Sequence, residues 1–154
     1  EIIKTEIMKK EKQINIIHIT PLSLENVKNI KFDTIIIEDD LKKYQNQKEQ
    51  LKKICKEATY VIINTDINQK YSEIETQNII TCGINQNAIV TISSNSEEDI
   101  LIFWQKSIEN KVGYKIEIEE RRIKKEEQCN LKIDEILILY AIFKIYDISI
   151  IDKI

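Results

Sequence analysis

The chain has 154 residues, of which 42% are hydrophobic and 32% are charged, and its formal net charge at pH 7 is −3. This length and composition are typical of one folded domain and exclude an intrinsically disordered chain. A small negative net charge does not favour nucleic acid, which binds clustered Lys and Arg, so we expect no nucleic-acid partner.

The three cysteines, Cys55, Cys82 and Cys129, are far apart and show no CxxC spacing. The sequence therefore predicts neither a disulfide framework nor a zinc site, and a reducing compartment fits best.

The most apolar stretch, residues 136–143, is shorter than the roughly 20 residues that cross a membrane, so no membrane partner is expected. Heavy use of Ile, Lys and Asn is typical of an AT-rich bacterial genome. We expect a bacterial, cytoplasmic protein.

The first half of the chain contains short β-branched runs without clean polar alternation, which predict strands that are buried on both faces. Such strands are usually parallel and covered by helices. The predicted strands are residues 14–19, 34–38, 60–63 and 78–82.

Helices are predicted between these strands. Residues 41–58 carry apolar side chains close to a 3.6-residue period, which predicts an amphipathic helix with Asp39 or Asp40 as its N-cap. Residues 23–29, after Pro21, and residues 69–75 predict shorter helical turns. Strands alternating with helices indicate a parallel α/β sheet.

The pattern changes after Gly83. Residues 88–94, 99–108 and 113–125 predict three antiparallel strands, the last with Tyr114, Ile116 and Ile118 alternating against charged residues. Of Phe103 and Trp104, which are adjacent, one is expected in the core and the other at the surface.

The tail is apolar nearly all round, which favours a helix packed in the core over residues 131–148, with a strand as the alternative. The predicted fold is α/β: a mostly parallel sheet with flanking helices, followed by antiparallel strands and a packed C-terminal helix. We expect one domain over residues 1–154, with the parallel part in 1–83 and the antiparallel strands in 84–125.

Several kinds of site need residues that this chain contains rarely. Gly83 and Gly113 are its two glycines, and neither has the context of a Walker phosphate loop or of a GxGxxG dinucleotide loop. His18 is the single histidine, so a catalytic triad or a multi-histidine metal site would have to be built around it. We interpret His18 as a structural residue in a strand pattern.

Polar residues follow two of the predicted strands. Glu38, Asp39 and Asp40 are candidate metal ligands, because parallel sheets place ligand and Mg²⁺ contacts at the carboxyl ends of their strands. The alternative is that they begin the next helix and complement its dipole. Asn64 and Asp66 are candidate cofactor-binding residues, or equally residues of an Asx turn.

The order of these features resembles the later half of the central domain of the Mur ligases, the ATP-dependent amide-forming enzymes of bacterial cell-wall synthesis. The stretch FDTIIIEDDLKKYQNQKEQLKKICKEATYVIINTDIN, followed by NIITCGINQNAIVTISS, carries the resemblance. Residues 64–67 resemble the family's Asn-Ala-Asp-Asp, and residues 81–85 its Thr-Tyr-Gly-Phe-Asn with Cys82 in place of Tyr. Residues 134–148 resemble the closing helix. We interpret Cys82 as a packing residue.

The chain also departs from this family pattern. Where the family has Thr-Asn and then Asp-His-Leu-Asp, residues 38–41 read Glu-Asp-Asp-Leu. The family's carbamylated lysine and the His-Asn opening of its closing helix have no counterpart. The resemblance implies that a phosphate loop would lie upstream of Glu1 and an amino-acid-binding domain after Ile154. Losing several charge-neutralising groups should abolish the ligase reaction, since one such group typically contributes about two orders of magnitude in rate or more.

Three functional hypotheses follow. The first is a catalytically degenerate Mur-ligase-like protein, without a cofactor, that acts by binding a ligand or an unknown protein partner. The second is a fragment or divergent member of an ATP-dependent amide-forming ligase, in which residues 38–40 with Asn64 and Asp66 bind ATP and Mg²⁺. The third is a structural homodimer, joined through an open sheet edge or through an apolar face near Trp104.

Overall fold

The computed structural model describes residues 17, 19–125 and 131–148, which divide into two compact units. The N-terminal unit covers the described residues up to Thr81, and the C-terminal unit covers those from Cys82 onward. The predicted α/β class, with parallel strands and helices followed by antiparallel strands and a C-terminal helix, is confirmed. The prediction of one domain over residues 1–154 stays a prediction.

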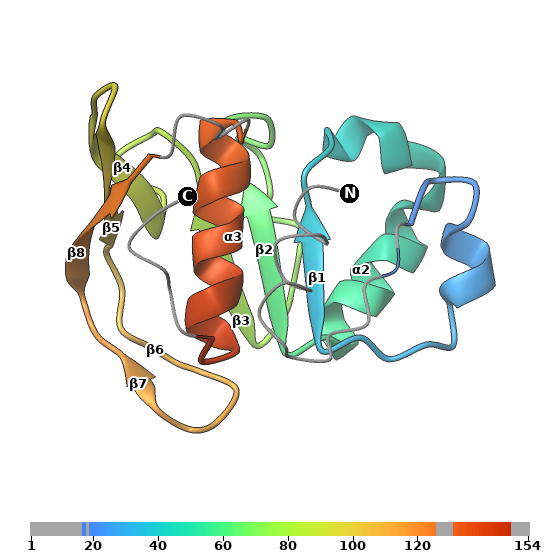
Figure 1. Cartoon of the computed structure of the whole chain (residues 1–154). Coiled ribbons are helices and arrows are strands. Elements are labelled where there is room, and N and C mark those ends of the chain that lie inside the picture. The colour runs from blue at the N-terminus through green and yellow to red at the C-terminus, as the bar shows by residue number, and fades with distance from the viewer. Residues whose placement is uncertain (1–16, 18, 126–130, 149–154) are drawn as a thin grey trace. The chain divides into compact units, whose positions relative to one another are not determined.

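Parallel strands form the centre of the N-terminal unit. β1 (Thr34–Ile37) pairs in parallel with β2 (Tyr60–Asn64), in a register that runs from Thr34 opposite Tyr60 to Ile37 opposite Ile63. β3 (Asn78–Cys82) is next to β2 in the strand order. Figure 1 shows β1 and β2 side by side. All five residues of β2 are buried, as the β-branched run predicts.

The predicted helix between these strands is present in two parts. η2 (Leu41–Gln47) is a 3-10 helix that continues directly into α2 (Lys48–Glu57), and a shorter 3-10 helix, η1 (Leu24–Val27), comes earlier in the chain. Asp40, one of the two predicted N-caps, caps η2, because its side chain accepts a hydrogen bond from the backbone N–H of Lys42 at 2.9 Å.

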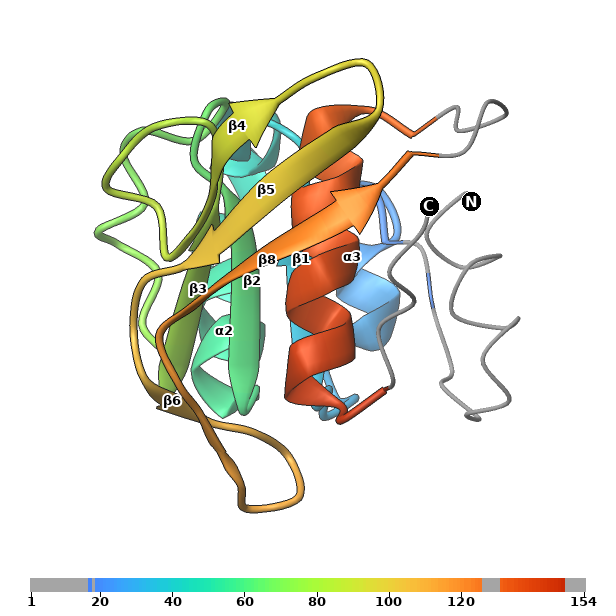
Figure 2. The ribbon, with the colours of Figure 1, turned by 60° about the vertical axis from the view of Figure 1, so that its left-hand side comes forward.

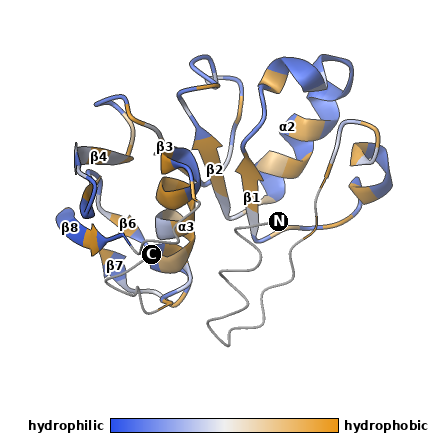
Figure 3. Cartoon of the chain, turned by 45° about the horizontal axis from the view of Figure 1, so that its top comes forward, coloured by the Kyte–Doolittle hydropathy of each residue, from blue (hydrophilic) through white to orange (hydrophobic). Residues whose placement is uncertain are grey.

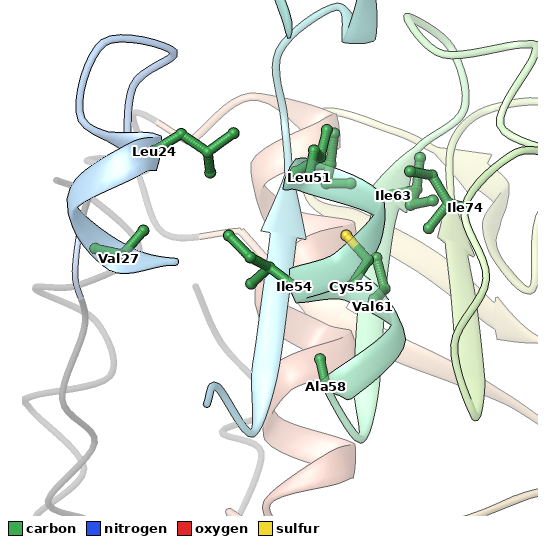
Figure 4. Packing of buried hydrophobic residues seen from close by; sticks show 10 residues of the cluster. Leu24, Val27, Leu51, Ile54, Cys55, Ala58, Val61, Ile63 and Ile74 are labelled. Carbon is green, nitrogen blue, oxygen red and sulfur yellow. The ribbon is translucent and has the colours of Figure 1, made fainter. Parts of the chain in front are cut away.

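The core of the N-terminal unit lies between α2 and β2. Leu51, Ile54 and Cys55 of α2 pack with Val61 and Ile63 of β2 (Figure 4). The other buried members of this cluster are Leu24, Val27, Ile37, Ala58 and Ile74. Leu24 and Val27 belong to η1, so the apolar face of that short helix joins the same core.

Two predicted elements of the N-terminal half are not found as predicted among the described residues. The strand predicted over residues 14–19 lies largely outside the described residues, as does His18. Residues 69–75 form no helix; they contain one turn, in which the N–H of Ile74 donates to the C=O of Tyr71 at 2.9 Å. A segment this short does not contain enough helical hydrogen bonds to offset the cost of nucleation.

The C-terminal unit is built on antiparallel strands (Figure 2). β4 (Val90–Asn95) pairs with β5 (Asp99–Trp104), and β5 pairs with β8 (Glu119–Lys124). On its other side β4 pairs in parallel with the end of β3, where Cys82 lies opposite Val90. Trp104 is fully buried and its neighbour Phe103 is partly exposed, as their alternation predicts.

The strand predicted over residues 113–125 is divided. Its beginning forms β7 (Lys115–Ile116), which pairs with β6 (Ile108–Glu109), and β8 follows as a separate strand. Ile116 is buried while Tyr114 and Ile118 are exposed. The three alternating apolar residues therefore do not form one buried face of a single strand. The loop between β6 and β7 is closed by the side chain of Asn110, which accepts hydrogen bonds from two backbone N–H groups.

The predicted C-terminal helix is α3 (Ile133–Ile145), and the alternative of a strand is wrong. Nine of its thirteen residues are buried, on every side of the helix, and its ribbon is mostly orange in Figure 3. It packs against β4. After its end, Asp147 adopts a φ of 52° and the N–H of Ile148 donates to the C=O of Phe143 at 2.8 Å, which closes the helix. Among the described helices, none combines the length and apolar character that crossing a membrane requires.

A polar network joins α3 to β8. The hydroxyl of Tyr140 donates to Glu119 at 2.5 Å, and the ammonium of Lys144 lies 2.6 Å from the same carboxylate oxygen. Burial acts to raise the pKa of Glu119, but the hydrogen bonds from Lys144 and Tyr140 outweigh it and lower this pKa. Burial, and then the bond to Glu119, raise the pKa of Tyr140. The network thus favours an ionised Glu119 and a protonated Tyr140.

We predict that Glu119→Gln weakens the acid sensitivity of folding. Because the folded-state pKa of Glu119 is lowered, its stabilising contribution is present above its unfolded pKa of about 4.3 and is lost as the pH falls through the folded value. Urea unfolding at a series of pH values measures this slope. Glu97→Gln, at an exposed position, is the matched control. Equal acid slopes in the two variants would contradict the prediction.

Candidate functional site

The in-register pairing of β1 with β2 brings the predicted site residues to one edge. Because Ile37 lies opposite Ile63, Glu38 and Asn64 are the next residues at the carboxyl ends of two neighbouring parallel strands. We call residues 38–41 and 64–68 the β1–β2 edge. All five predicted site residues belong to it.

The side chain of Asn68 joins the two segments of this edge. It is 4% exposed; its amide nitrogen donates to the C=O of Asp39 at 2.9 Å, and its amide oxygen accepts from the N–H of Leu41 at 2.8 Å. The side chain of Asn68 therefore satisfies two backbone groups in the loop between β1 and η2, as a neighbouring strand would do in a sheet. Sequence reasoning missed this residue. The available signal was an amide side chain four residues after Asn64, just beyond a buried strand.

Asn64 is fixed in a turn. Its side-chain oxygen accepts from the N–H of Asp66 at 3.0 Å, and its backbone C=O accepts from the N–H of Asn68 at 3.0 Å. This is the Asx turn that the sequence left open as an alternative, with Asn64 buried and Asp66 exposed. The role of Asn64 and Asp66 in binding a cofactor stays a prediction.

The carboxylates after β1 have lysine and backbone partners. Asp39 accepts from the ammonium of Lys43 at 2.7 Å, with both side chains more than half exposed. The hydrogen bond with Asp39, and then its charge, raise the pKa of Lys43. Asp40 accepts from the N–H of Lys42, as described for the cap. These two carboxylates therefore stabilise the beginning of η2, which is the helix-starting role that the sequence left open.

A metal ion at this edge would compete with those contacts. Mg²⁺ takes oxygen ligands, so binding through Oδ1 of Asp39 would compete with the ammonium of Lys43. Within the ranges that the structure describes, no group of three or more His, Cys, Asp or Glu is placed to hold a metal ion. The assignment of Glu38, Asp39 and Asp40 as metal ligands stays a prediction.

The described thiols are poor nucleophiles. Cys55 is fully buried, and burial raises its pKa to about 12. Cys82 is 1% exposed and donates to the C=O of Leu137 at 3.8 Å. Cys129 lies outside the described residues. Cys55 and Cys82 thus behave as small packing residues.

Comparison with known proteins returned no match among family models, curated proteins or solved structures. The likeness to the Mur ligases therefore depends on the sequence stretches quoted above, and family membership stays a prediction.

We predict that Asn68→Ala lowers the free energy of unfolding by about 1–3 kcal/mol, because it removes two part-buried hydrogen bonds that each contribute about 0.5–1.5 kcal/mol. Asn46→Ala, at an exposed position, should change it by less than about 0.5 kcal/mol. Denaturant unfolding compares the two. Equal effects would contradict the role given to Asn68.

Asn68→Asp separates the two hydrogen bonds. The introduced carboxylate can still accept from Leu41 but cannot donate to the C=O of Asp39. At neutral pH we expect the variant to have a lower free energy of unfolding than the wild type. This difference should become smaller below about pH 4, because the protonated carboxyl can again donate a hydrogen bond. A loss that is independent of pH would show that donation to Asp39 has no energetic weight.

A Cys129→Ser variant tests the two buried thiols directly. For Cys55, a pKa of about 12 leaves roughly one thiolate in ten thousand at about pH 8. Burial blocks the access of a reagent to both thiols. We expect labelling by a disulfide reagent to be at least about a thousandfold slower in the folded variant than in urea. Rapid labelling of the folded variant would identify an accessible thiol and contradict the packing role.

Proposed function

We propose that this chain is a Mur-ligase-like module that has lost the ligase reaction and acts by binding a ligand or a protein partner. The proposal assigns it to the cytoplasm of a bacterium, on the basis of its composition and cysteine spacing. It is supported by two features of the sequence: the order of strands and helix resembles that of the family, and the polar motif that the resemblance implies after the first of the two paired strands, β1, reads differently here.

The contacts of Asp39 and Asp40 carry the proposal. In a ligase, side chains at this edge would hold Mg²⁺ against the phosphates of ATP, as the resemblance implies. Here Asp39 lies 2.7 Å from the ammonium of Lys43, and Asp40 caps η2. A cation next to a carboxylate opposes the binding of a second cation. These residues therefore support folding at the place where the family supports catalysis.

The retained residues support the same interpretation. Asn64, which the resemblance aligns with the first residue of Asn-Ala-Asp-Asp, closes a turn with Asp66. Asn68 connects that turn to the loop after β1. A loop that is fixed in this way still presents a defined surface after chemistry is lost, so binding is the activity that the edge can retain.

A second candidate is a divergent or fragmentary ATP-dependent amide-forming ligase. The observation in its favour is that five polar residues lie at or just after the carboxyl ends of two paired parallel strands: Glu38, Asp39, Asp40, Asn64 and Asp66. Under this reading they bind ATP and Mg²⁺ together with sequence beyond this chain. The third candidate, a structural homodimer, does not exclude either of the others.

Thermal unfolding with and without ATP and Mg²⁺ tests the proposal. We expect no change in Tm at millimolar ATP and Mg²⁺. A ligase site with ATP at a hundred times its Kd would add about 2.7 kcal/mol, which raises the Tm of a chain of this size by roughly 5–10 °C.

Two controls make that result specific. Mg²⁺ alone and ATP with a chelator separate ion effects from nucleotide binding. If ATP with Mg²⁺ stabilises the wild type and Asp39→Ala removes that stabilisation, the degenerate-module proposal is overturned and the ligase candidate takes its place.

A further inference from the structure

Residues 69–77, which lie between β2 and β3, form neither a helix nor a strand. We call them the strap. Ile74 is its one buried residue, and Tyr71 packs partly buried against the core of the N-terminal unit. Within the described residues, the backbone hydrogen bond of the strap is internal, because the N–H of Ile74 donates to the C=O of Tyr71 at 2.9 Å. The contacts that hold the strap to the rest of the described unit are therefore made by side chains.

Three lysines form a row along α2, on the side where the strap lies. Lys48, Lys52 and Lys56 are each four residues apart, so they share one side of the helix. Glu73 of the strap forms an ion pair with Lys48 and lies 3.1 Å from the ammonium of Lys52. Glu75 lies 3.6 Å from the ammonium of Lys56. The two carboxylates of the strap thus follow the order of the lysines along the helix.

Glu73 is the centre of these ion pairs. Hydrogen bonds from Lys48, and then from Lys52, lower its pKa, so its carboxyl is ionised at neutral pH. The side chains of Glu73 and Lys48 are about half exposed. Ion pairs in contact with solvent stabilise a structure only slightly, and salt screens them. The ionic attachment of the strap is therefore weak and depends on ionic strength.

The two ends of the strap are fixed more firmly than its middle. Asn68, just before it, is held by two hydrogen bonds to the loop after β1. Asn78, just after it, begins β3 and donates to the C=O of Thr59 at 3.2 Å. In the strap itself, Thr76 donates to the C=O of Ala58 at 2.8 Å. A segment with fixed ends, one buried side chain and exposed ion pairs opens at a lower free energy than the strands beside it.

Cys55 lies at the place on α2 that the strap covers. It follows Lys52 by three residues and Lys48 by seven, so it lies where the lysine row meets the buried face of the helix. Cys55 and Ile74 belong to one buried cluster (Figure 4). With the strap in place, Cys55 is fully buried. Lifting the strap withdraws Ile74 from this cluster and opens the side of α2 on which Cys55 lies.

We propose that the strap is a salt-sensitive cover for Cys55, which lifts from α2 while the helix and the neighbouring strands stay folded. The pairs of Glu73 and Glu75 with the lysine row set how often it lifts. Each opening gives solvent access to a thiol that is otherwise inert. The proposal is independent of the loss of ligase chemistry, because it depends on α2 and the strap and not on the β1–β2 edge.

Thiol labelling of the full chain carrying Cys129→Ser tests the strap, with an uncharged disulfide reagent and mass spectrometry to assign the label to Cys55 or Cys82. At about 20 mM salt, Glu73→Gln should raise the labelling rate of Cys55 roughly twofold to tenfold, because it removes two ion pairs. Glu57→Gln is the matched control, since Glu57 is exposed and lies nine residues after Lys48, on the opposite side of α2. It should leave the rate unchanged.

Salt provides a second measurement on the same proteins. Raising the salt from about 20 mM to about 0.5 M shortens the Debye length from about 20 Å to about 4 Å, so the rate at Cys55 should rise by a factor similar to that of Glu73→Gln. The variant that carries both Glu73→Gln and Glu75→Gln should lose this salt effect, because it lacks the carboxylates that salt would screen.

Urea distinguishes lifting of the strap from unfolding of the whole unit. Local opening exposes little surface, so the rate at Cys55 should hardly change with urea below the unfolding transition. A rate that rises with urea as steeply as global unfolding overturns the inference. So do equal rates in Glu73→Gln and Glu57→Gln, a salt effect that persists without both carboxylates, or no labelling of Cys55 in the folded chain. None of these rates depends on ATP, so the outcome is distinct from that of the nucleotide experiment.

Discussion

A strand that is buried on both faces must pair its backbone polar groups with other protein groups, because water cannot reach them. The pairing of β1 with β2 meets this requirement for the centre of the N-terminal unit, where every residue of β2 is buried. The same pairing fixes where the two strands end. Polar residues that follow β1 and β2 must then lie at one edge, whatever chemistry they perform. The position of the candidate site is thus a consequence of backbone pairing, and its chemistry is a separate question.

The backbone at that edge gives its polar residues a structural role, whether or not they also take part in chemistry. Each strand leaves a short loop with N–H and C=O groups that no ladder satisfies. Asp40 satisfies one of them at the beginning of η2, Asn64 closes the turn after β2, and Asn68 bridges from that turn to the loop after β1. Removing such a side chain leaves a backbone group without its protein partner, which costs stability. The demands of folding alone can therefore account for polar residues at this edge.

Sequence reasoning succeeded where the pattern depended on burial. The run that became β2 is β-branched and every residue of that strand is buried, and α3 is apolar all round because it is buried on every side. β1 is less covered than its run predicts, since Ile37 is the one buried residue among its four. It failed where long-range contacts decide. The bridge from Asn68 joins segments 27 and 29 residues apart, and no local period encodes it. The 3-10 start of the helix and the break before β8 likewise depend on loop bonds and burial that alternation cannot reveal.

The two polar systems of the chain differ in what they leave exposed. At the β1–β2 edge, the side chains are used to close loops. On β8, one face is attached to α3 through Glu119, Tyr140 and Lys144, while Glu120, Arg122 and Lys124 keep their side chains exposed on the other face. The polar side chains of β8 thus join a strand to a helix, whereas those of the β1–β2 edge join loops to one another.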